Sequence, residues 1–162
     1  RKLGLPGREE LAIGAIASGG IRILNEDIIH ELGVNQETVD FVTEREMREM
    51  ERREQQYRGN RPAPDVHDRK VILIDDGLAT GASMLAAVRG VHIQHPARVV
   101  VAVPAAAPEA IHLLQPEADE IVYGMAPDPF EGVGKWYKDF SQTTDEEVRS
   151  LLDESKQHLQ NK

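Results

Sequence analysis

Hydrophobic and polar residues follow different patterns in the two halves of the chain. Near the N-terminus, small and β-branched residues flank the turn sequence Ser18-Gly19-Gly20, and this predicts a β-hairpin over residues 9–24. Asn25 is a favourable N-cap residue and Gly33 a favourable C-terminal stop, so a short helix is expected between them. Residues 36–58 then show the periodicity of a long amphipathic helix.

The long helix is expected to bury one apolar stripe and to expose a charged face. Acidic residues stand four positions before basic residues along the exposed face, an arrangement typical of a solvated helix. Phe41 lies off the stripe and suggests contact with a second subunit, so a homodimer is expected. The stripe consists of Val39, Val42, Met47, Met50 and Tyr57.

After a loop over residues 59–69, uninterrupted apolar segments alternate with helical ones. Such Val- and Ile-rich segments are typical of parallel strands that helices cover on both faces, so the fold class is α/β. Thr143 and Thr144 offer alternative capping boxes for a C-terminal helix. The predicted strands are 71–74, 99–103 and 120–123, and the predicted helices between them are 82–94 and 108–114.

The segment Val71–Met84 carries the clearest chemical signal. Its apolar strand delivers Asp75 and Asp76 to the edge of the sheet where α/β proteins bind ligands. A loop of small residues follows and opens a helix near Gly81, where main-chain N–H groups favour a phosphate. Since the acids repel phosphate, they are expected to bind hydroxyl groups. A ribose 5-phosphate is a ligand that carries hydroxyl groups on one side and a phosphate on the other.

Two common phosphate-binding motifs do not match this segment. A Walker A loop needs a lysine after its last glycine, and Gly81 is followed by Ala82 and Ser83. A dinucleotide fingerprint needs three closely spaced glycines, and this loop has only Gly77 and Gly81.

Val71–Met84 resembles the phosphoribosyl pyrophosphate signature of type I phosphoribosyltransferases at all fourteen positions. The resemblance implies that Asp75 and Asp76 hold the ribose hydroxyls, and that they serve a metal indirectly, through those hydroxyls. It also implies that a five-residue loop cradles the 5′-phosphate. That loop consists of Ala79, Thr80, Gly81, Ala82 and Ser83.

The resemblance extends, less specifically, to both ends of the chain. Residues 1–7 are similar to the start of a mobile loop in adenine-type members, which implies that Arg1 and Lys2 approach the pyrophosphate. The pattern over 130–140 is similar to that of bacterial members of unassigned substrate, and it implies an aromatic hood in which Phe130 and Trp136 stack on the acceptor. One domain over 1–162 is therefore expected, with a flap hairpin at 9–24, a core at 66–125 and a hood with the C-terminal helix at 126–162.

Two departures from the family pattern bear on the activity. Family members carry an earlier strand and a pyrophosphate-binding loop ahead of the position of Arg1, so an N-terminal part is expected to be missing. The hypoxanthine-guanine branch has an aspartate at the position of Ala79, and the alanine argues against that branch.

Composition narrows the possible partners. The 162 residues carry a net charge of −9, which disfavours nucleic acid as a partner. The absence of cysteine excludes a disulfide scaffold and a cysteine nucleophile. No segment resembles a membrane span or a secretory signal, so a cytoplasmic protein is expected.

The expected activity is transfer of a 5-phosphoribosyl group from phosphoribosyl pyrophosphate to a nitrogenous base, with Mg²⁺ assisting the departure of pyrophosphate. A non-catalytic regulatory protein that binds the same sugar phosphate is the alternative. A hydrolase or phosphorylase acting on ribose phosphates is the third possibility. The sequence does not distinguish the three, because all would keep the same binding motif.

Overall fold

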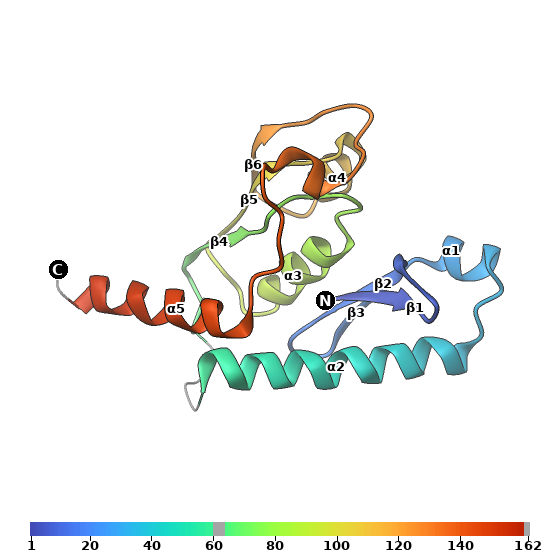
Figure 1. The fold of residues 1–162 in the computed structure, drawn as a ribbon, viewed down its shortest axis with the longest axis horizontal. Coiled ribbons are helices and arrows are strands. Elements are labelled where there is room, and N and C mark those ends of the chain that lie inside the picture. Colours follow the sequence, from blue (N-terminus) through green and yellow to red (C-terminus); the bar gives the residue numbers. More distant parts are fainter. Residues whose placement is uncertain (60–63, 161–162) are drawn as a thin grey trace.

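The computed structural model describes residues 1–59 and 64–160, so part of the predicted loop over 59–69 lies outside the described residues. An antiparallel sheet and a long helix occupy one side of the molecule, and a parallel sheet occupies the other (Figure 1). The elements are β1 (Lys2–Leu5), β2 (Arg8–Ala17), β3 (Ile21–Leu24), α1 (Glu26–Glu31), α2 (Gln36–Arg58), β4 (Lys70–Ile74), α3 (Ala82–His92), β5 (Arg98–Ala105), α4 (Pro108–Leu114), β6 (Glu120–Met125), the 3-10 turn η1 (Val133–Trp136) and α5 (Asp145–Gln160).

The predicted hairpin is confirmed as β2 and β3, which pair in antiparallel register. The sequence missed β1, which pairs with the other edge of β2 and makes a sheet in the order β1-β2-β3. The register between β1 and β2 shifts twice around Gly4, so no regular alternation marks this strand in the sequence. Arg1 and Lys2 therefore stand at the start of a strand, where the resemblance implied the start of a mobile loop.

The helix α2 has the bounds that the periodicity predicted, and the Asn35 side chain caps its first turn. Val39 and Val42 are buried against the antiparallel sheet, as expected. Met47 was wrongly assigned to the buried stripe, since it is 37% exposed. Glu46 is buried in its place, because Arg1, the residue just before β1, pairs with its charge.

The three strands of the second half form a parallel sheet in the order β4-β5-β6, as predicted. Helices α3 and α4 pack on one face of this sheet and form a shared hydrophobic core with it. Val101 of β5 and Leu114 of α4 are fully buried in this core. The continuous apolar segments of the sequence thus become the centre of an α/β layer.

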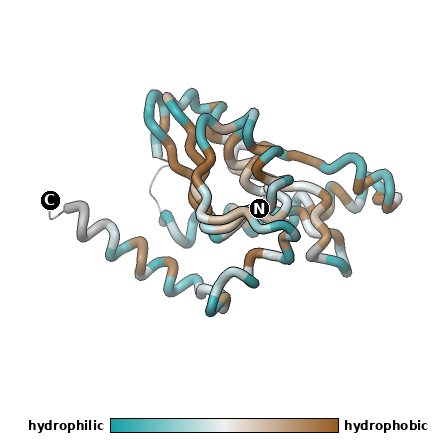
Figure 2. Tube along the Cα trace, turned by 90° about the horizontal axis from the view of Figure 1, so that it is seen from above, coloured by the Kyte–Doolittle hydropathy of each residue, from teal (hydrophilic) through white to brown (hydrophobic). Residues whose placement is uncertain are grey.

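The prediction that helices cover both faces of this sheet is wrong for the described residues. On the face opposite α3 and α4, Ile72, Ile74 and Val122 are 56%, 77% and 49% exposed. Side chains alternate between the two faces of a strand, so an apolar residue at every position does not by itself show that both faces are covered. Figure 2 shows the hydrophobic strands side by side, whereas α5 alternates between hydrophobic and hydrophilic residues.

Specific contacts join the two sheets and the C-terminal helix. Strand β2 packs along α3, and a Cβ atom placed on Gly90 would lie 3.4 Å from that of Ala17. Thr144 forms the predicted capping box with Glu147 at the start of α5. The Tyr57 hydroxyl of α2 donates a hydrogen bond to Asp145 of α5. No helix within 1–59 or 64–160 has the length and apolar character needed to cross a bilayer.

Candidate functional site

The paired acids Asp75 and Asp76 follow directly after β4, at the carboxyl end of the parallel sheet. Leu78 anchors the loop that carries them, because its side chain is buried and its main chain pairs with the end of β5. Its N–H donates to Ala105 and its carbonyl accepts from Ala107. The acids are therefore held on a short loop between two fixed points, the end of β4 and Leu78.

The loop of residues 79–83 leads directly into α3, as the sequence predicted. Gly81 is the N-cap residue and has a left-handed conformation, with φ of 75°. A Cβ atom there would lie 3.2 Å from that of Ala110, so both the backbone angle and the packing favour glycine. Gly81 offers no side chain to cap the helix, and the first N–H groups of a helix have no acceptor within it. This helix start suits an anion.

A cavity of about 430 Å³ borders this loop on the side of the antiparallel sheet. Thr80 and Ala82 contribute from the loop, and Gly14 contributes from β2. A Cβ atom on Gly14 would lie 2.3 Å from the carbonyl oxygen of Ile23, so only glycine fits at this place in the wall of the cavity. The antiparallel sheet thus closes one side of the space beside the candidate phosphate loop.

Partial burial raises the pKa of the Asp75 carboxyl above its ordinary value of 3.8, and the charge of Asp76 adds to this rise. A hydrogen bond of 3.0 Å from the N–H of Asp76 to Asp75 Oδ1 opposes the rise. The main-chain nitrogen of Arg1 also lies near Asp75. The structure thereby brings the start of β1 toward the paired acids, two segments that are far apart in the sequence.

The turn η1 packs onto the loop that carries the acids, a contact that sequence reasoning missed. The Tyr137 hydroxyl donates a 2.7 Å hydrogen bond to the main-chain carbonyl of Asp76. A Cβ atom on Gly77 would lie 2.7 Å from Val133 Cγ1, so glycine permits this close approach. The aromatic residues concentrated over 130–140 were the one feature of the sequence that could have indicated this contact. They did not indicate that Tyr137 and Val133 make it.

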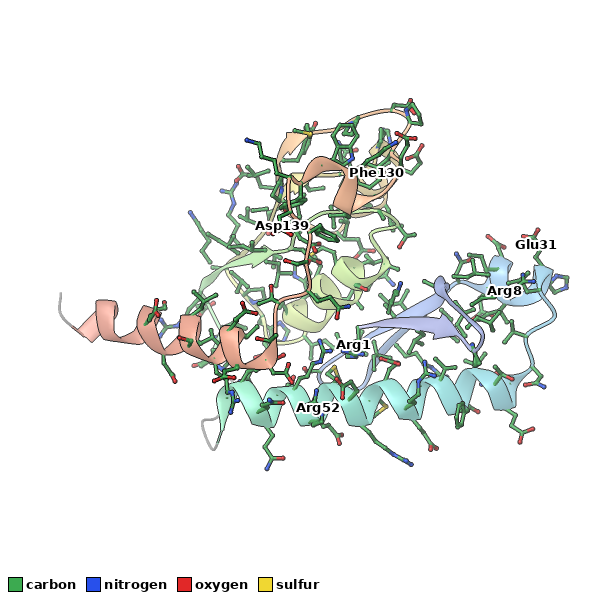
Figure 3. The ribbon with its side chains drawn as sticks, in the orientation of Figure 1. Arg1, Arg8, Glu31, Arg52, Phe130 and Asp139 are labelled. Carbon is green, nitrogen blue, oxygen red and sulfur yellow. The ribbon has the colours of Figure 1, made fainter. Side chains whose placement is uncertain are left out.

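The two aromatic residues assigned to the acceptor differ in their surroundings. Phe130 packs against the hydrophobic core formed by the parallel sheet and its helices. Trp136 is 38% exposed, and its ring lies 6.5 Å from that of Phe130. Figure 3 shows Phe130 in the same part of the molecule as the parallel sheet, well away from α2.

Arg1 and Lys2 lie in a different environment, beside α2. The guanidinium of Arg1 donates hydrogen bonds of 2.9 and 2.6 Å to Glu46 Oε2, and Figure 3 shows Arg1 between the antiparallel sheet and α2. A cavity of about 250 Å³ is lined by Arg1, Lys2, Gly4, Arg45 and Glu46. The sequence indicated Arg1 and Lys2 as candidate site residues, but it did not indicate Arg45 or Glu46.

Residues 4–121 match the sequence model of the phosphoribosyl transferase domain. This match covers most of the chain and spans β2, the paired acids and the loop before α3. The chain belongs to the phosphoribosyl transferase domain family. The resemblance seen in Val71–Met84 is thereby confirmed at the level of the family.

Relatives of the phosphoribosyl transferase domain include two proteins from Mycobacterium tuberculosis, named "Putative phosphoribosyl transferase MT0597" and "Putative phosphoribosyl transferase Rv0571c". Each is 36% identical over 153 residues, which are 94% of this chain and 34% of the relative. The chain therefore spans about a third of the length of these curated relatives. The crystal structure of TT1426 from Thermus thermophilus is 41% identical, with a TM-score of 0.70 over 95% of this chain and 73% of that one.

The acids that bear on a metal site in this phosphoribosyl transferase domain are Asp75 and Asp76. Among the described residues, no three His, Cys, Asp or Glu side chains lie together in a way that could hold a metal ion. Asp75 and Asp76 provide two carboxylates on one loop, one fewer than the three side chains of such a cluster.

Proposed function

We propose that this chain binds 5-phosphoribosyl 1-pyrophosphate and transfers its phosphoribosyl group to a nitrogenous base. The bond between C1 of the ribose and the pyrophosphate oxygen breaks, and a bond from C1 to the nitrogen forms. Pyrophosphate leaves with the electron pair, and the nitrogen loses a proton. The observation that carries this proposal is the placement of paired acids and an uncapped helix start on consecutive segments at the edge of the parallel sheet.

Each part of the sugar phosphate would have its own partner in the site. Asp75 and Asp76 would accept hydrogen bonds from the ribose hydroxyls, and the charge of the carboxylates would favour the positive charge that develops on the sugar. The N–H groups and hydroxyls of residues 79–83 would bind the 5′-phosphate. Because Leu78 fixes the loop between these two groups, diol and phosphate would be held at a constant separation.

Mg²⁺ is the proposed cofactor, held by Asp75 and Asp76 through the sugar hydroxyls. When bound, it would neutralise charge on the departing pyrophosphate. Arg1 and Lys2 would bind the same group from the start of β1. The acceptor would lie under η1, where Trp136 exposes part of its ring while Phe130 anchors the segment to the core.

The double substitution of Asp75→Asn with Asp76→Asn tests the binding part of this proposal. We expect the affinity for phosphoribosyl pyrophosphate to fall by about a hundredfold or more, since hydrogen bonds to charged groups contribute about 1.5–3 kcal/mol each. The matched control removes two exposed acids elsewhere, Glu31→Gln with Glu37→Gln, and should bind as the wild type does. Calorimetric titration measures both. Wild-type affinity in the Asp75/Asp76 variant would contradict the assignment.

Turnover tests the transfer step. The protein is incubated with Mg²⁺, phosphoribosyl pyrophosphate and a panel of bases, and pyrophosphate release is followed. Release that depends on a base supports the transferase. Tight binding without release would identify a regulatory protein, and release without any base would identify a hydrolase.

A further inference from the structure

Glu46 is an acid on the face of α2 that packs against the antiparallel sheet. It follows Val39, Val42 and Thr43 on that face, at the spacing that otherwise selects apolar residues. Its side chain is only 12% exposed. A carboxylate in such a place is unfavourable unless cations pair with it, so its partners explain why it is tolerated.

The two oxygens of Glu46 bind two different arginines. Oε2 accepts both hydrogen bonds from Arg1, at 2.9 and 2.6 Å. Oε1 accepts from Arg45 Nε at 3.1 Å, and Arg45 Nη2 lies at the same distance. A single buried carboxylate therefore orients two guanidinium groups from distant segments, one just before β1 and one on α2. Planar groups held by such bonds lose little further freedom when an anion binds.

These side chains line one cavity of about 250 Å³, together with Lys2 and Gly4. The guanidinium groups of Arg1 and Arg45 against the one carboxylate of Glu46 leave a formal excess of one positive charge among these three side chains. The cavity also adjoins Arg1, just before β1, whose main-chain nitrogen lies near Asp75. It therefore lies toward the paired acids, on the side of α2, and its charge suits a polyphosphate anion.

We propose that Glu46 is a positioning residue, which holds Arg1 and Arg45 around this cavity so that they bind the pyrophosphate group of the substrate. This inference rests on the proposed function for the identity of the anion. Glu46 itself touches no substrate, and its effect passes through the two arginines. Arg45 is then a binding residue that neither the sequence pattern nor the family resemblance indicated.

The substitution Glu46→Gln separates a positioning role from a purely electrostatic one, because the two roles predict opposite changes in the affinity for an anion. Removing a negative charge beside a cationic cavity should by itself strengthen anion binding. Loss of the carboxylate that orients Arg1 and Arg45 should weaken it. We expect the Kd for inorganic pyrophosphate with Mg²⁺ to rise about tenfold or more in Glu46→Gln, since bonds to charged groups are roughly twice as strong as neutral ones.

The matched control is Glu44→Gln on the exposed face of α2, where Glu44 pairs with Arg48 at 3.4 Å. It removes the same charge from the same helix, and its pyrophosphate affinity should stay at the wild-type value or rise slightly. Unchanged or tighter binding in Glu46→Gln would overturn the inference. So would a loss of unfolding free energy in Glu46→Gln without any loss of affinity, because Glu46 would then only join β1 to α2.

A second pair of variants keeps the inference falsifiable if Glu46→Gln does not fold. Arg45→Gln should weaken pyrophosphate binding, whereas Arg48→Gln on the exposed face should not. Equal affinities in these two variants would overturn the inference. Neither substitution leaves a buried charge without a partner, because Glu46 keeps its pair with Arg1 and Glu44, the partner of Arg48, is exposed.

Turnover of phosphoribosyl pyrophosphate, measured on the same preparations, distinguishes the two proposals. Pyrophosphate binding that depends on Glu46, without base-dependent turnover, would retain the inference and reject the transferase. Turnover with identical kcat and KM in Glu46→Gln would retain the transferase and reject the inference. A wild-type protein that fails to bind millimolar pyrophosphate would also reject the inference.

Discussion

Replacing Gly77 by alanine should force the turn η1 away from the loop that carries the paired acids. The added Cβ atom would lie 2.7 and 2.9 Å from the two methyl carbons of Val133, and 3.0 Å from the carbonyl oxygen of Ala105. Real Cβ atoms do not approach other atoms this closely, so the turn or the loop must move. Overpacking of this kind costs about 1–3 kcal/mol, and we expect Gly77→Ala to lose unfolding free energy in that range.

A double-mutant cycle with Val133→Ala assigns the loss to this contact. Val133→Ala alone should cost about 1 kcal/mol, because Val133 is half-buried and loses two methyl groups. In the double variant the two methyl clashes are gone and only the approach to Ala105 remains. The combined loss should therefore be smaller than the sum of the single losses, by about 1–2 kcal/mol.

Urea unfolding followed by circular dichroism measures each free energy, and Gly90→Ala provides the matched control. Gly90 lies inside α3, where an added Cβ atom would meet Ala17 at an ordinary 3.4 Å. Because alanine favours a helix, this variant should gain up to about 1 kcal/mol. If Gly77→Ala is as stable as the wild type, or if its loss is unchanged in the Val133→Ala background, the packing of η1 on the loop is not as described.

Three further predictions concern the paired acids and the C-terminal helix. Partial burial raises the pKa of Asp75 above its ordinary value of 3.8, so ionisation of this carboxyl makes folding progressively less favourable as the pH rises from 3.8 through the raised pKa. Urea unfolding should therefore show Asp75→Asn to be more stable than the wild type at pH 7, and the difference should vanish below pH 3.8, the ordinary value at which the acid becomes neutral in both states. Tyr137→Phe removes the bond to Asp76 and should cost about 0.5–1.5 kcal/mol, with weaker binding of phosphoribosyl pyrophosphate in calorimetric titration. Thr144→Ala removes the capping box with Glu147 and should lower the unfolding free energy by about 0.5–2 kcal/mol while leaving that affinity unchanged.

The sequence by itself determined those parts of the protein whose physics is local. Helix α2 could be delimited because an N-cap residue and a periodicity of 3.6 act within the segment itself. The same is true of Asp75, Asp76 and the loop before α3, since a strand, two acids and a helix start follow one another along the chain. A site built from consecutive residues can be found without knowing how the chain folds around it.

Only the tertiary structure decided which distant residues complete that site. Tyr137 meets Asp76 across 61 positions, and Glu46 meets Arg1 across 45. The residues next to Tyr137 or Glu46 in the sequence do not indicate these partners. A buried glutamate cannot be told from an exposed one in the sequence, because its burial depends on a cation that is distant along the chain. The exposure of Ile72 and Ile74 likewise could not be predicted from the apolar sequence of β4. It depends on which other elements pack on each face of the sheet.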